Sequence, residues 1–243
     1  MATASLFNDV LKNELKISAA WLPIANPFAL GDYGVMSDGI FTKVGNLAND
    51  FQIPIKRESG QDLLLKFASA DVDEVRFEAG GKVTAFSNSP NADAKLTLQF
   101  QSANSFFLRS NLTAIQMPNM AVVARAIFDS PKWDDWSYNY RVVSTVYNGR
   151  DCALLSSTAA GASVELSATA DALSQLDVGN AAVGLKASAK KSIGLDLVGA
   201  SGVVGLKFFK LTLFGGGKPK VLATDPVPPE YFASEAELQK DDL

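Results

Sequence analysis

The chain is 243 residues long, 47% hydrophobic and 20% charged, with a formal net charge of −4. This hydrophobic content can build a buried core, which excludes a wholly disordered chain, and the acidic balance gives no support to a nucleic-acid partner. Histidine is absent and cysteine occurs once, so the sequence cannot form a Ser-His hydrolase site or a tetrahedral zinc site. We therefore expect no catalytic residue, no metal and no cofactor.

The cellular compartment is predicted from the cysteine content and from the first residues. Cys152 has no second cysteine with which to form an internal disulfide, which indicates a reducing compartment. The opening residues lack the basic and apolar stretches of a signal peptide. The most apolar stretch, 198–217, is interrupted by lysines, so we expect no transmembrane helix and a cytoplasmic protein.

The first elements are an opening helix and a series of short strands. Residues 4–16 predict an amphipathic helix, because Phe7, Leu11 and other apolar residues recur at helical spacing. Turn signals at Asp38-Gly39 and its neighbours bound two short strands. The strands expected in the first hundred residues are 33–36, 40–43, 62–67, 74–78, 82–86 and 95–100.

The middle of the chain carries a helix, an aromatic cluster and a hairpin signal. Residues 120–129 predict a helix with Asn119 as a possible N-cap. The cluster Trp133-Asp134-Asp135-Trp136 either fills a corner between a helix and a strand or offers a ligand site. Asn148-Gly149 stands between two apolar runs, which predicts a β-hairpin turn at that point.

Small residues dominate the segment that follows. It has no aromatic residue between Tyr147 and Phe208, and residues 162–169 and 181–197 alternate in polarity around a short helix expected over 169–176. One interpretation is a thin or curved sheet, in which Gly and Ala permit close approach. The other is a set of strands that leave their first packing and become amphipathic hairpins, with one face toward lipid.

The end of the chain differs in composition from the rest. We expect residues 1–224 to form a single β-rich domain and residues 225–243 to form a Pro-containing acidic C-terminal tail. Tyr231 and Phe232 supply apolar anchors by which the tail can restrain the domain, although a solvated tail that aids solubility is the alternative. The lysines expected to contact lipid are Lys186, Lys190, Lys191, Lys207 and Lys210.

This layout resembles that of the bacterial gasdermins. The shared features are an opening helix, an extended segment, a twisted sheet, two alternating regions poor in aromatic residues, and a short C-terminal segment after a basic strand. The resemblance covers most of the chain and is one of layout. It implies a pore-forming domain that a C-terminal tail holds inactive until a protease removes that tail.

We therefore expect an α+β fold of mainly antiparallel twisted β-sheet, with an N-terminal helix and a few short helices. The expected function is that of a non-enzymatic membrane-perforating or self-assembling effector whose small-residue strands rearrange on activation. Its expected partners are membrane lipids, further copies of the chain and an activating protease. The alternative is a cytoplasmic binding or scaffold module without membrane activity, and a carboxylate-only enzyme through Asp134 and Asp135 ranks third.

Overall fold

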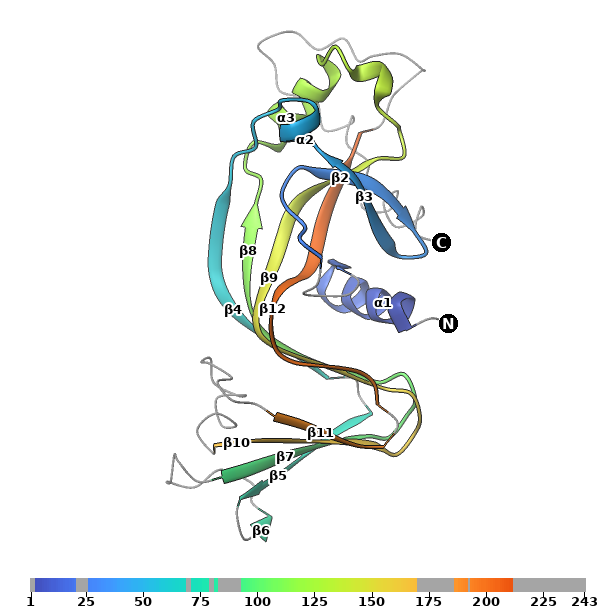
Figure 1. Cartoon of the computed structure of the whole chain (residues 1–243), viewed down its shortest axis with the longest axis vertical. Helices are drawn as coiled ribbons and strands as arrows, with labels where there is room; N and C mark the ends of the chain where they lie inside the picture. The colour runs from blue at the N-terminus through green and yellow to red at the C-terminus, as the bar shows by residue number, and fades with distance from the viewer. Residues whose placement is uncertain are drawn as a thin grey trace. The chain divides into compact units, whose positions relative to one another are not determined.

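The computed structural model of the chain confirms the expected fold class. It describes residues 3–20, 26–68, 71–78, 81–82, 93–169, 186–191 and 193–211. The fold is α+β and mainly antiparallel, with short helices (Figure 1). The helices are α1 (Thr3–Leu15), α2 (Leu47–Asp50), α3 (Met120–Phe128) and the 3₁₀-helix η1 (Trp133–Asp135).

The described strands form two sheets. The seven-stranded sheet contains the path β1-β12-β9-β2-β3, and β8 joins it by pairing with β9 and with β4. Its strands are β1 (Ser18–Ala19), β2 (Asp32–Ser37), β3 (Ile40–Asn46), β4 (Glu58–Ala68), β8 (Phe106–Gln116), β9 (Arg141–Ser157) and β12 (Ile193–Lys210). The five-stranded sheet has the order β11-β10-β7-β5-β6. Its strands are β5 (Val72–Glu78), β6 (Gly81–Lys82), β7 (Asp93–Phe100), β10 (Ala162–Thr169) and β11 (Lys186–Lys191).

The chain divides into two compact units rather than into consecutive segments. Unit 1 comprises Met1–Gly60, Ala114–Asn148 and Val203–Leu243, and unit 2 comprises Gln61–Thr113 and Gly149–Gly202. Four strands, β4, β8, β9 and β12, have residues in both units. The predicted division into a domain of residues 1–224 and a tail of residues 225–243 stays a prediction, because residues 212–243 lie outside the described part.

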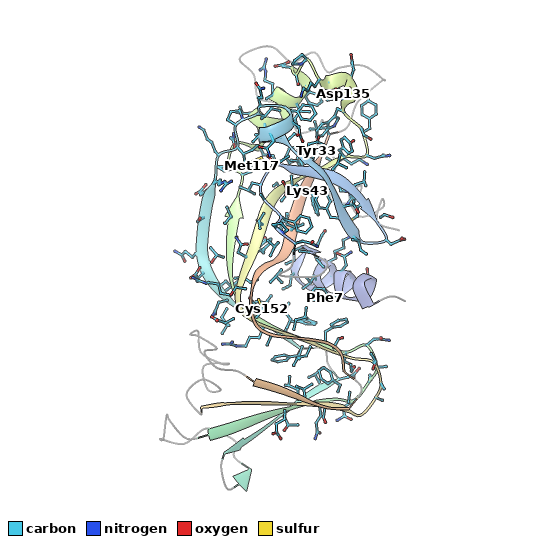
Figure 2. The ribbon with its side chains drawn as sticks, viewed as in Figure 1. Phe7, Tyr33, Lys43, Met117, Asp135 and Cys152 are labelled. Carbon is cyan, nitrogen blue, oxygen red and sulfur yellow. The ribbon has the colours of Figure 1, made fainter. Side chains whose placement is uncertain are left out.

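The opening helix packs into unit 1 as its pattern predicts. Phe7 and Leu11, four residues apart on α1, are fully buried, because residues at this spacing lie on one face of a helix. Figure 2 shows Phe7 on this helix. The buried Asn8 side chain accepts a hydrogen bond of 2.9 Å from the backbone of Ala19 in β1, which fixes the helix to the sheet.

The hairpin of β2 and β3 is also as predicted. Ser37 pairs with Ile40, so Asp38 and Gly39 between them form a two-residue turn. The φ values of Asp38 and Gly39 are 51° and 73°. Glycine suits this turn because it adopts a positive φ without steric cost.

The helix predicted over 120–129 is α3, and the side chain of its predicted N-cap residue does not cap it. Asn119 makes no capping hydrogen bond with its side chain. Its Oδ1 instead accepts a hydrogen bond of 3.2 Å from the backbone N–H of Lys56. The helix is held mainly by its buried face, which includes Val123, Ala124 and Ile127.

The Trp133–Trp136 cluster fills the corner between α3 and β9, as the first interpretation of it predicts. Both tryptophans are buried, and the side chains of Asp134 and Asp135 are exposed. The ring of Trp136 lies 5.5 Å from that of Tyr33 and 5.3 Å from that of Tyr140. The indoles are therefore part of the core and do not form an open platform for a ligand.

The predicted hairpin at Asn148-Gly149 is wrong. Both residues lie inside β9, which continues for 17 residues. A hairpin requires its two flanking runs to pair with each other, whereas both runs here pair with β8. Met117 N donates to Ser144 O at 2.9 Å before this point, and Ser110 Oγ donates to Arg150 O at 3.3 Å after it. The positive φ of 52° in this strand belongs to Asp151.

The small-residue segment forms strands in unit 2. Residues 162–169 form β10. Of the second alternating segment, 181–197, the described residues belong to β11 and β12, and residues 181–185 and 192 lie outside the described part. The predicted strand 82–86 is described only at its start, as β6. The predicted short helix over 169–176 lies outside the described residues after Thr169.

Candidate functional site

Strands β7 and β10 of the five-stranded sheet place their apolar positions on one face. In the register of β7 and β10, Leu98 pairs with Val164 and Leu96 pairs with Leu166. The intervening pair, Thr97 with Glu165, belongs to the opposite face because successive residues of a strand alternate between faces. The two strands therefore share one apolar face and one polar face, called here the apolar face and the polar face.

The edge strand β11 continues this pattern. Ala189 pairs with Val164 and Ala187 with Leu166, so β11 contributes small apolar residues to the apolar face. Its intervening positions belong to the polar face: Lys191 pairs with Ser163, Ser188 with Glu165 and Lys186 with Ser167. Lys190 stands where the register shifts between Ser163 and Val164.

The apolar face is covered at one end of the strands. Leu98, Phe100, Ala162 and Val164 have exposed fractions of 0–1%. Gln99, the residue between the first two, is exposed. The alternation of the sequence therefore corresponds to a real difference in burial between the two faces, which supports an amphipathic sheet.

The five predicted lipid-contact lysines do not gather in one compact unit. Lys186, Lys190 and Lys191 belong to β11 in unit 2. Lys207 and Lys210 belong to β12 in unit 1, where Lys207 is exposed and Lys210 is half-buried. Tyr231 and Phe232, the predicted anchors of the tail, lie outside the described residues, so their role stays a prediction.

Three side chains, of which Asp62 and Arg150 are exposed and Thr113 is half-buried, link neighbouring strands in unit 2. Asp62 of β4 accepts hydrogen bonds from Thr113 of β8 and from Arg150 of β9. These two partners hold the pKa of the Asp62 carboxyl below its usual range, the Thr113 hydroxyl contributing most. Because the charged pair of Asp62 and Arg150 is exposed, this cluster positions strands and stabilises them weakly.

Cys152 is a buried structural thiol. It lies on β9 (Figure 2), is buried, and its Sγ is 3.0 Å from Ser110 Oγ. Burial raises the pKa of this thiol, which disfavours the reactive thiolate at neutral pH.

A polar network in unit 1 stabilises the β2–β3 hairpin and the segments beside it. The buried carboxylate of Asp32 accepts hydrogen bonds from Ala29 N at 2.8 Å and Asn46 Nδ2 at 2.7 Å, and it pairs with Lys43 Nζ at 2.8 Å. Nearby, the hydroxyl of Tyr33 donates to Asp50 Oδ2 at 3.1 Å. Burial together with this bond raises the pKa of Tyr33 to about 12, so the phenol stays protonated. Figure 2 shows Tyr33 on β2 and Lys43 on β3, the two strands of the hairpin described above.

Two kinds of feature are absent from the described ranges. No cluster of three or more histidine, cysteine, aspartate or glutamate side chains in those ranges is arranged to hold a metal ion. No helix among the described residues has the length and hydropathy needed to cross a membrane.

The chain has a weak structural neighbour. No protein-family model and no curated protein sequence matches it. Among solved structures, it is similar to a cryo-EM structure of the gasdermin A3 membrane pore. The match covers 88% of this chain and 92% of that chain, at 9% sequence identity and a TM-score of 0.31. These values indicate a weak resemblance of fold.

Sequence reasoning missed the part that β7 takes in the amphipathic sheet. The alternation of residues 95–100 is visible in the sequence, but nothing in it shows that this strand lies between β5 and β10. The cluster of Asp62, Thr113 and Arg150 was missed too. Its members are 51 and 88 residues apart in the chain, and no local pattern connects them.

Proposed function

We propose that this chain is a non-enzymatic effector that inserts amphipathic strands into membranes and perforates them as an oligomer. The observation that carries the proposal is the shared apolar face of β7, β10 and β11. A membrane-spanning β-wall needs this alternation, because one face meets lipid and the other meets water. It also needs paired strands, since lipid offers no partner to backbone polar groups.

Strand length shows why a rearrangement belongs to the proposal. A strand that crosses a bilayer needs about 9–11 residues. β7 and β10 have eight residues each and β11 has six. The described parts of these strands are therefore shorter than a membrane span, and the proposal requires continuous paired strands of the full length. Side chains that are small favour such a change, because little buried apolar surface holds them in the first packing.

Restraint, lipid contact and assembly complete the proposal. The C-terminal tail restrains the chain through Tyr231 and Phe232, and a protease that removes the tail releases it. Lysines then attract anionic lipid, as exposed basic groups do at charged membranes. Several copies are needed, because a few strands from one chain cannot close a barrel wide enough to conduct. The lysines proposed for this contact are Lys186, Lys190, Lys191, Lys207 and Lys210.

Dye release from vesicles of phosphatidylcholine and phosphatidylglycerol tests the function. We expect the full-length chain to be inert, and we expect the double variant Tyr231→Ser with Phe232→Ser to bind the vesicles and release dye. Tyr138→Ser is the control, because it removes an exposed aromatic ring elsewhere in the chain. It is expected to stay inert.

Two adjacent positions of β11 test whether the apolar face meets lipid. In the released double variant, Ala187→Asp places a charge at a position of the apolar face, and Ser188→Asp places one at a position of the polar face. Charges on the lipid side of a membrane strand are destabilising. We expect dye release to be lost with Ala187→Asp and kept with Ser188→Asp.

Two results would overturn the proposal. If the double variant and a chain ending at Thr224 both stay monomeric and release no dye, the chain is better described as a binding or scaffold module. If the two β11 variants release dye equally, the apolar face does not meet lipid.

A further inference from the structure

Strand β5 pairs with β7 so that its charged residues lie opposite the apolar residues of β7, whereas β10 places its apolar residues there. Glu74 pairs with Leu98 and Arg76 pairs with Leu96, so β5 places charged residues at positions of the apolar face. Its own apolar residues fall on the polar face: Val75 pairs with Thr97 and Phe77 pairs with Lys95. On the other side of β7, Val164 pairs with the same Leu98 in the expected phase.

The pairing of β5 is therefore set by something other than its hydrophobic pattern. In a sheet with one buried face, matching of apolar positions normally decides the register. Here the start of the strand is held instead, because Gln101 N donates to Asp71 O at 2.8 Å and Val72 pairs with Phe100. On its other side β5 has only two described pairs with β6, Phe77 with Lys82 and Glu78 with Gly81. Among the described residues, these two pairs at the end of the strand are the backbone pairing on that side that a shift must break.

A shift of one residue in either direction moves Val75 and Phe77 to the apolar face, but the charge pairs favour one direction. If Val75 moves opposite Leu98, Phe77 comes opposite Leu96, and the polar face gains Glu78 opposite Lys95, a pair of opposite charges. The reverse shift brings Arg76 opposite Lys95 and Glu78 opposite Asp93, both of like charge. Like charges directly opposite each other destabilise a sheet, so the first direction is favoured.

We propose that β5 shifts by one residue against β7 when the sheet meets a lipid surface, bringing Val75 opposite Leu98. The proposal rests on the proposed function and deepens it. The described register leaves three charged positions of β5 on the apolar face: Glu74, Arg76 and Glu78. The shifted register leaves one, Asp73, opposite Phe100 at the end of the strand. A one-residue slip moves every side chain of a strand to the other face, so this small change makes the lipid side of β5 apolar apart from Asp73.

Disulfide trapping distinguishes the two registers in the full-length chain. All variants carry Cys152→Ser, which removes the cysteine of the natural sequence, and all share Thr97→Cys. Val75→Cys reports the described register, and Arg76→Cys reports the shifted one, because directly opposite positions bring two Cβ atoms within disulfide reach. Glu165→Cys is the matched control, since it pairs with Thr97 across β7 and β10, whose register is not expected to change.

Each variant is oxidised mildly with and without phosphatidylcholine–phosphatidylglycerol vesicles, with and without the Tyr231→Ser and Phe232→Ser changes. Without vesicles we expect the 75–97 and 165–97 disulfides to form and the 76–97 disulfide to be scarce. With vesicles and the released chain, we expect the 76–97 disulfide to rise about tenfold or more, because exposing or burying one large apolar side chain changes an equilibrium by at least that factor. Closing the 75–97 disulfide beforehand should block dye release, and a reductant should restore it.

The outcomes separate this proposal from the proposed function. Dye release while only the 75–97 disulfide forms overturns the register shift and leaves the function standing. A 76–97 disulfide formed on vesicles without dye release supports the shift and counts against the function. A 76–97 disulfide that closes equally well without vesicles overturns the shift. Released chains that bind no vesicles overturn the proposed function and, with it, the shift that rests on it.

Discussion

Asn8 Oδ1 accepts a hydrogen bond of 2.9 Å from the backbone N–H of Ala19, and both residues are buried. Replacing Asn8 by Ala leaves this N–H without an acceptor, which costs about 1–3 kcal/mol for a buried group. We expect the free energy of unfolding of Asn8→Ala to fall by that amount in urea titrations. Asn13→Ala, at an exposed position of the same helix, should change it by less than about 0.5 kcal/mol. Equal midpoints for the two variants would show that α1 is held by its apolar contacts alone.

Substitutions at two glycines with positive φ distinguish the cost of backbone strain from the cost of steric contact. Gly39 and Gly161 have φ values of 73° and 75°. A Cβ at Gly39 would lie 2.7 Å from Asn8 Nδ2, whereas a Cβ at Gly161 would meet nothing within 4 Å. We expect Gly161→Ala to cost about 1–2 kcal/mol from the left-handed backbone, and Gly39→Ala to cost more. Thermal melts of the two variants check this order, and the reverse order would contradict the described packing of α1 on the β2–β3 turn.

The carboxylate of Asp32 should be essential for unit 1. Asp32→Ala leaves the backbone N–H of Ala29 and the side-chain amide of Asn46 without their acceptor. We expect a loss of about 1–3 kcal/mol, since both donors are part-buried and each loses its bond to the carboxylate. Asp38→Asn is the control, because asparagine suits the left-handed conformation of this exposed turn residue. Chemical denaturation measures both, and a neutral Asp32→Ala would show that water replaces the carboxylate.

Lys12 should make stability depend on pH in the alkaline range. Burial, with the charge of Arg141, lowers the pKa of Lys12 from 10.5 to about 8. Between these two pH values the unfolded chain binds a proton that the folded chain lacks, so this residue makes stability rise as the pH rises. The penalty for burying the charge is fully present below about pH 8.

Lys12→Met removes this titration. We expect the variant to gain stability relative to the natural chain at pH 7, by no more than about 1 kcal/mol because solvent screens a partly exposed group. The gain should shrink as the pH approaches 10.5. Asn13→Met, at an exposed position of α1, supplies a control without a lysine titration. A gain for Lys12→Met that does not change between pH 7 and pH 10 would show that the lysine is not affected by burial.

Local patterns were sufficient for the elements whose partners lie nearby in the chain. The opening helix follows from apolar spacing that includes Phe7 and Leu11, and the β2–β3 hairpin follows from Asp38-Gly39. In both cases the interactions that decide the structure lie within a few residues. The absence of histidine and the single cysteine likewise limit the available chemistry, because residue counts do not depend on how the chain folds.

Tertiary structure decided what depends on pairing between distant strands. Asn148-Gly149 carries the same type of turn signal as Asp38-Gly39, yet it lies inside β9 because β8 pairs with the residues on both sides of it. The alternation of β5 and β7 is visible in the sequence, but their relative phase, Glu74 opposite Leu98, is a property of the register alone. A sequence determines which faces a strand has. Only the fold decides which neighbour each face meets, because register is set by contacts that lie far apart along the chain.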